Sequence, residues 1–109
     1  MLELGANRIR KIENLETLEN LEELFLGTNK IAKLENLNSL KKLRLLSIQC
    51  NRIVKIENLD QLSELEDLFL SNNGLESIEN LDHNSKLSTL GLFFKFVHSF
   101  LIRIFFFLF

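Results

Sequence analysis

The sequence predicts an α/β solenoid of 22-residue units, with a concave parallel sheet and short α or 3₁₀ turns on the convex side. A block of the form Asn-x-Ile-x-x-Ile-Glu-Asn-Leu, with Leu replacing Ile in places, recurs every 22 residues without insertion. The first unit is incomplete and begins near Leu2; the second, third and fourth begin at Leu21, Leu43 and Leu65, and a fifth begins at Leu87. Apolar residues alternate before each block and recur at every third position within it and beyond it. A strict period in this range is typical of repeat architectures, in which each repeat is one supersecondary unit.

A short strand is expected just before each block. In the second unit, Leu24 and Leu26 alternate with Phe25, so the leucines point to one face of an extended segment and the ring to the other. The same alternation recurs at Leu46 and Ile48, at Leu68 and Leu70, and at Leu90 and Leu92. We expect these apolar pairs to face the core and the residues between them to form the concave surface.

A return with helical spacing is expected after each strand. From the second unit into the start of the third, the apolar residues fall at Ile31, Leu34, Leu37, Leu40 and Leu43. Intervals of three are compatible with α or 3₁₀ turns, and one strand plus one return completes a coil. The fourth unit departs from this pattern at Asn84, where a Leu is expected.

The first Asn of each block is predicted to form a structural ladder. The chain must turn inside the stack at the end of each strand, where backbone groups are shielded from water. An Asn amide both donates and accepts, so it can satisfy backbone groups of adjacent coils. The expected ladder consists of Asn7, Asn29, Asn51 and Asn73.

Composition and motifs point away from catalysis and from nucleic acid. The net charge of −2 comes with no basic stripe of the kind that binds DNA or RNA. The single Cys50 excludes an internal disulfide. The sequence has no Gly-rich phosphate loop, no metal-ligand spacing and no paired carboxylates in a setting that suits acid–base catalysis. We therefore expect no enzyme activity, no cofactor and no metal.

The concave face is the predicted site of partner binding. Outward-facing aromatic residues on a rigid strand array are plausible anchors for an interface, and carboxylates beside them can pair with basic groups of a partner. The predicted contact residues are Glu3, Glu23, Phe25, Ser47, Asp67 and Phe69. The alternative interpretation is a solvated, charged sheet on which two aromatic rings only fill space.

The repeat subtype carries a resemblance to a known family. The motif Ile-x-x-Ile-Glu-Asn-Leu, with segments such as Leu24-Phe25-Leu26-Gly27, resembles the leucine-rich repeats of the protein phosphatase 1 regulatory subunit 7 family. This resemblance covers residues 1–92. It implies a non-enzymatic protein of nucleus and cytoplasm that binds the phosphatase catalytic subunit on its concave face.

The resemblance also implies particular contacts. Carried over by position, it gives a phosphatase-contacting acid at Glu3 and an aromatic at Phe25. A further acidic position of the family falls on Gly91, so that contact is lost. We therefore expect the chain to bind the phosphatase more weakly than the family does.

The repeat pattern ends after Leu92. Lys95 stands where the next ladder Asn is expected, and residues 93–109 form a Phe-rich apolar tail in place of later repeats and a cap. Three hypotheses remain open for this tail: a splice or translation product of T-rich sequence, a membrane tail anchor, or a hydrophobic cap. Lys95 and Arg103 disfavour the anchor, because each costs about 2.5–3.5 kcal/mol at the centre of a bilayer. The alternative functions are accordingly a membrane-tethered repeat product or a nonfunctional truncated product.

The amino end starts within a repeat, with no cap before Leu2. Repeat proteins need capping units for solubility, and open strand edges pair with other chains. We therefore expect weak stability and self-association through the uncapped ends.

Overall fold

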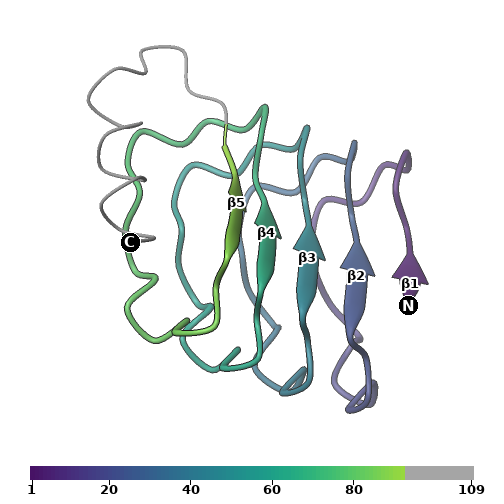
Figure 1. The fold of residues 1–109 in the computed structure, drawn as a ribbon. Helices are drawn as coiled ribbons and strands as arrows, with labels where there is room; N and C mark the ends of the chain where they lie inside the picture. Colours follow the sequence, from purple (N-terminus) through teal and green to yellow (C-terminus); the bar gives the residue numbers. More distant parts are fainter. Residues whose placement is uncertain (93–109) are drawn as a thin grey trace.

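The structure is a computed structural model that describes residues 1–92; the predicted tail, residues 93–109, lies outside the described residues. Five short strands lie side by side in chain order and form one parallel sheet, with the returns running behind it (Figure 1). The predicted repeat solenoid with a parallel sheet is thus confirmed. The strands are β1 (Leu2–Glu3), β2 (Glu23–Phe25), β3 (Leu45–Ser47), β4 (Asp67–Phe69) and β5 (Thr89–Gly91).

The register of the sheet follows the sequence period. Leu24 on β2 lies opposite Leu46 on β3, which lies opposite Leu68 on β4, and this offset of one unit holds along the whole sheet. Equivalent residues of successive units therefore stand in straight rows across the strands. Because side chains alternate along a strand, one set of rows faces the core and the other forms the concave surface.

The core is a single stack of the consensus Leu and Ile positions. In the third unit Ile53, Ile56 and Leu62 have no exposed surface. In the fourth unit Leu75 and Ile78 are only half-buried, although they occupy the same repeat positions. Burial of each residue therefore depends on the neighbouring coils as well as on its own place in the repeat.

The returns contain isolated turns, and residues 1–92 contain no α- or 3₁₀-helix. The amide of Leu40 donates to the carbonyl of Leu37 at 3.0 Å, and that of Leu43 donates to Leu40 at 3.0 Å, so the helical spacing corresponds to i→i+3 turns. Asn36, which precedes them, has a φ of 60° and cannot belong to a right-handed helix. Strand β3 follows almost at once, so two turns fill the space available.

Asn51 joins the second and third units through its side-chain amide. Its Nδ2 donates to the carbonyl of Leu26 at 2.9 Å in the preceding unit, and to Ile48 at 3.1 Å and Gln49 at 3.2 Å in its own. Its Oδ1 accepts from the amide of Ile31 at 3.0 Å. The corresponding four contacts are made by Asn29 and Asn73.

Asn7 makes a smaller set of contacts. Its Nδ2 donates to the carbonyls of Leu4 at 2.9 Å and Gly5 at 3.0 Å, both in its own unit, and the residue is exposed. Among residues 1–92, the bonds of this column that join one unit to the next therefore begin at Asn29.

A second Asn column, which the sequence reading missed, lies on the returns. The Asn of each Glu-Asn-Leu adopts a left-handed conformation, with φ between 59° and 62° at Asn14, Asn36, Asn58 and Asn80. Asn is among the few residues that accept this conformation readily. The Nδ2 of Asn58 donates to the carbonyl of Leu34 at 2.7 Å, and equivalent bonds run from Asn36 to Ile12 and from Asn80 to Ile56. This second ladder joins neighbouring units on the convex side, and the first joins them at the ends of the strands.

Candidate functional site

The central row of the concave face contains four of the six predicted contact residues. Glu3 lies opposite Phe25, Phe25 opposite Ser47, and Ser47 opposite Phe69. Gly91 continues the row on β5. The parallel register thus gathers residues that are far apart in the sequence into one line across the sheet.

The two aromatic side chains are half-buried on this face. Phe69 lies across the neighbouring Gly91: a Cβ atom at that glycine would stand 2.6 Å from Cδ1 of the ring. Any other residue at position 91 would therefore force the ring of Phe69 to move. The missing side chain at Gly91 is what lets the ring lie over β5.

Ser47, between the two aromatics, is only 5% exposed. Its hydroxyl donates to Oε1 of Gln49, whose side chain lies over Gly27. Of the six predicted contact residues, Ser47 is consequently the one that offers a partner the least surface.

Glu23 and Asp67 lie at the edge of the face and share one cation that the sequence reading missed. The guanidinium of Arg44 lies 2.8 Å from the carboxylate of Glu23 and 3.7 Å from those of Asp67 and Glu66. All four side chains are partly exposed, so water weakens these attractions. A partner's basic group must compete with Arg44 for the two predicted carboxylates.

Glu3 lies on β1, at one end of the central row, and is exposed. Its Oε1 accepts a hydrogen bond of 2.6 Å from the amide of Gly5, and no ion pair involves it within residues 1–92. A shallow groove of about 370 Å³ passes beside it and is also lined by Phe25, Gly27 and Gln49. An exposed carboxylate, an aromatic ring and a groove therefore meet at this end of the concave face.

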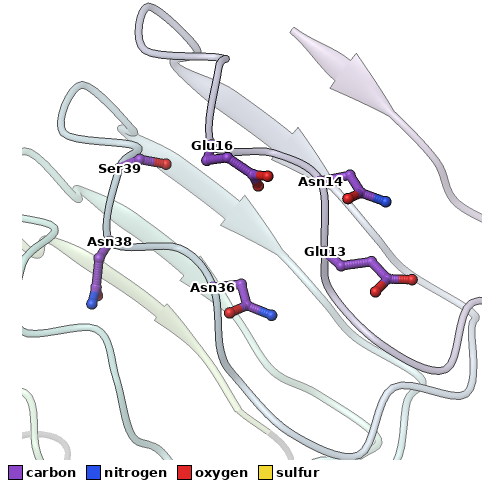
Figure 2. A pocket seen from close by; sticks show the side chains of 6 residues that line it. All are labelled: Glu13, Asn14, Glu16, Asn36, Asn38 and Ser39. Carbon is purple, nitrogen blue, oxygen red and sulfur yellow. The ribbon is translucent and has the colours of Figure 1, made fainter.

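A larger groove, of about 480 Å³, lies between the returns of the first two units. Figure 2 shows Glu13 and Asn14 on one return and Asn36 and Ser39 on the next. A matching groove of about 390 Å³ lies two units along the chain and includes Glu57, Asn58, Asn80 and His83. These polar grooves repeat because the coils repeat, and they contain no apolar anchor.

The described residues, 1–92, hold no group of three or more His, Cys, Asp or Glu side chains arranged to bind a metal ion. The same stretch contains no helix long and apolar enough to cross a membrane.

Comparison with known proteins agrees with this architecture. The Leucine-rich repeat family matches residues 1–98. Curated proteins give no significant match. Internalin C2 of Listeria monocytogenes is similar to this chain with a TM-score of 0.78 and 32% identity, over 84% of this chain and 40% of that one. Internalin InlF of the same organism gives a TM-score of 0.72 and 34% identity, over 84% of this chain and 29% of that one.

A third structure, the functional domain of InlJ from Listeria monocytogenes, shares the fold at a TM-score of 0.57 and 20% identity, over 83% of this chain and 24% of that one. This chain spans less than half the length of each of these structures. With the repeated strand, the Asn ladder and the family match over nearly the whole sequence, the chain belongs to the leucine-rich repeat family.

Proposed function

We propose that this chain is a protein-interaction scaffold that binds the catalytic subunit of protein phosphatase 1 through its concave face. Leucine-rich repeat domains are typically non-enzymatic modules for protein binding. The observation that carries the finer proposal is the row that brings Glu3, Phe25 and Phe69 into one line. The resemblance of the repeat to the phosphatase regulator family implies that Glu3 and Phe25 contact the phosphatase.

The spacing of the aromatics supports an extended contact across several strands. Phe25 and Phe69 are separated by β3, so their strands are about 9.6 Å apart at a spacing of about 4.8 Å per strand. Half-buried aromatic rings of this kind are frequent anchors of protein interfaces. Apolar side chains of a partner that lie about 10 Å apart would meet both rings.

The charges favour a basic segment on the partner. Glu3 is exposed and unpaired within residues 1–92, so a basic group can approach it directly. Glu23 and Asp67 are reached only in competition with Arg44. Glu3 is therefore the carboxylate that contributes most to binding in this proposal.

The resemblance extends the proposal to location. A phosphatase regulator of this type works in nucleus and cytoplasm, and we propose the same two compartments for this chain. Imaging of the labelled full chain in eukaryotic cells tests the placement, and retention at membranes alone would contradict it.

Binding of the full chain to the purified phosphatase catalytic subunit tests the function. We expect Phe25→Ala to weaken binding by about tenfold or more, because anchor residues at interface centres carry at least ~2 kcal/mol. We expect Glu3→Ala to weaken it less and to reduce its dependence on salt. Calorimetric titration at two salt concentrations measures both effects.

Matched control variants lie on the returns. Val54 is 65% exposed and apolar, and Glu13 is an exposed acid of the same type as Glu3. Val54→Ala and Glu13→Ala should bind the phosphatase as the parent chain does. The proposal fails if the parent chain does not bind, or if Phe25→Ala binds as tightly as Val54→Ala.

A further inference from the structure

Asn73 differs from the other ladder residues in the residue that follows it. Asn7, Asn29 and Asn51 precede Arg or Lys, whereas Asn73 precedes Gly74 and forms the one Asn-Gly pair in the sequence. Asn is among the thermolabile residues of proteins, because the next backbone nitrogen can attack its side-chain carbon. Glycine lacks a Cβ and restricts the backbone least, so it favours that attack.

In the folded coil both reacting groups of this pair are held apart by hydrogen bonds. Asn73 Nδ2 donates to the carbonyls of Ile48 at 3.0 Å, Leu70 at 3.1 Å and Ser71 at 3.3 Å. Its Oδ1 accepts from the amide of Ile53 at 2.8 Å. The side-chain amide therefore cannot turn toward the next peptide group while the fourth unit stays docked.

The nucleophile is held as well. The amide of Gly74 donates to the carbonyl of Ile53 at 2.7 Å. Attack requires this nitrogen to lose its proton and leave that bond, so the third and fourth units must separate first. Leu75 and Ile78 are only half-buried in the fourth unit, which lowers the apolar contribution that keeps it closed.

We propose that Asn73-Gly74 is a deamidation site controlled by opening of the fourth unit. Once the unit opens, the Gly74 nitrogen bonds to Cγ of Asn73 while the Cγ–Nδ2 bond breaks and ammonia leaves. Water then opens the resulting cyclic imide at either carbonyl and gives aspartate or isoaspartate. The net change is the addition of one water and the loss of one ammonia, with no oxidant or metal.

The products cannot restore the native contacts. A carboxylate at position 73 lacks the N–H donors that now reach Ile48, Leu70 and Ser71, and it places negative charge against three carbonyl oxygens. Isoaspartate also adds a carbon to the main chain, which shifts the strict 22-residue register. Each opening that leads to reaction therefore leaves the fourth unit unable to dock as before.

The unmodified full chain, incubated at mildly alkaline pH with and without urea below its unfolding midpoint, tests the proposal. Peptide mass spectrometry follows the mass change at Asn73. We expect Asn73 in the folded chain to react at least tenfold more slowly than in a synthetic peptide of residues 68–80. We also expect its rate to rise with urea, in step with hydrogen exchange at the Gly74 amide.

Two variants provide matched controls. Gly74→Arg restores the residue type of the third unit, and the φ of Gly74 is not in the left-handed region. The added Cβ would stand 3.2 Å from Cγ1 of Val54, whose exposed side chain can move aside. Gly74→Arg should slow the reaction at Asn73 at least severalfold, because the added side chain restricts the backbone at the attacking nitrogen. Arg52→Gly creates the same pair after Asn51, whose following amide donates to Ile31 at the same 2.7 Å.

Asn51 in the Arg52→Gly variant should react several times more slowly than Asn73, because the third unit is more fully buried. The proposal is overturned if Asn73 reacts as fast in the folded chain as in the peptide, since the fold would then give no control. It is equally overturned if the two sites react at the same rate, or if neither responds to urea.

Discussion

The third and fourth units share the repeat block, the strand and the ladder Asn, but their interiors differ. Ile53 and Leu62 of the third unit are wholly buried, whereas Leu75 of the fourth is half-buried and Asn84 replaces the buried leucine. The consensus residues therefore set the path of each coil, while the neighbouring coils and departures such as Asn84 determine how completely its interior is buried. A repeat protein can keep its geometry while its stability changes from unit to unit.

Asn84 is the clearest departure. It is 3% exposed, and its Oδ1 has no hydrogen-bond partner in the described structure. Its Nδ2 donates to the carbonyls of Leu59 at 2.9 Å and Leu62 at 3.1 Å. Both carbonyls already accept backbone amides, so these two bonds do not rescue groups that would otherwise be unsatisfied.

The largest effect is expected when the buried leucine of the third unit is replaced by Asn, as it is at Asn84 in the fourth unit. Leu62→Asn removes a wholly buried leucine and buries an amide oxygen, so we expect a loss of about 4 kcal/mol in the free energy of unfolding. Urea denaturation followed by circular dichroism measures it. Leu18 occupies the same repeat position but is 36% exposed, so Leu18→Asn should cost about 1 kcal/mol or less. Equal losses for the two variants would refute this account of burial.

Removing a ladder side chain should have the next largest effect. Asn51→Ala leaves the buried amide of Ile31 without its acceptor and removes a link between units, so we expect a loss of about 3 kcal/mol. Asn7→Ala removes bonds within one exposed unit only and should cost about 1 kcal/mol or less. Thermal and urea unfolding compare them, and a smaller loss at Asn51 than at Asn7 would contradict the ladder's role.

The reverse change in the fourth unit should stabilise the chain. Asn84→Leu relieves the unpartnered Oδ1, adds apolar burial and leaves both carbonyls with their backbone donors. We expect a gain of about 1 kcal/mol and slower hydrogen exchange at the Gly74 amide. A destabilised variant would mean that the two Nδ2 bonds contribute more than the geometry indicates.

The smallest effect is expected at the surface of the fourth unit. Lys86 lies 2.7 Å from Glu64, and its hydrogen bond to that carboxylate, with the attraction between their charges, raises the pKa of the lysine. Because folding raises the pKa of Lys86, its pairing with Glu64 contributes to folded-state stability at neutral pH. This contribution is lost as the pH rises through the pKa of the folded state. The lysine side chain is 55% exposed, so Lys86→Met should leave the urea midpoint unchanged at pH 7. A clear shift would show that surface pairs help to hold the fourth unit.

Much of the fold was predictable because the information is local and repeated. Alternation around Phe25 and the constant 22-residue offset determine which residues face the core and which share a row. The form of the returns was harder to foresee, and the expectation of α or 3₁₀ turns left it open. Intervals of three suit both a helix and successive turns, and the left-handed Asn36 that decides between them is not an apolar position.

The site was predictable as a row but not in its contacts. The burial of Ser47 depends on the conformation of Gln49, which the sequence does not specify. The position of Arg44 between carboxylates was available from the period, since Glu22 and Glu66 stand one unit away on either side. Opposite charges one 22-residue period apart therefore predict contacts between neighbouring units, just as recurring leucines predict the core.

The uniform offset between units also has a consequence for folding kinetics. Hydrogen bonds between neighbouring units join residues 20 to 25 positions apart. Closing any one of these loops costs roughly the same entropy, about 3 kcal/mol in its length-dependent part. Chain separation therefore gives no unit an advantage, and side-chain content decides where folding begins.

The third unit, whose apolar consensus residues are all buried, is then the expected folding nucleus together with the second, where only Leu21 is partly exposed. The remaining coils add outward from these two. Contacts between neighbouring units span 22 of the 109 residues, about one fifth of the chain. Domains held together by such non-local contacts typically fold more slowly than helical bundles.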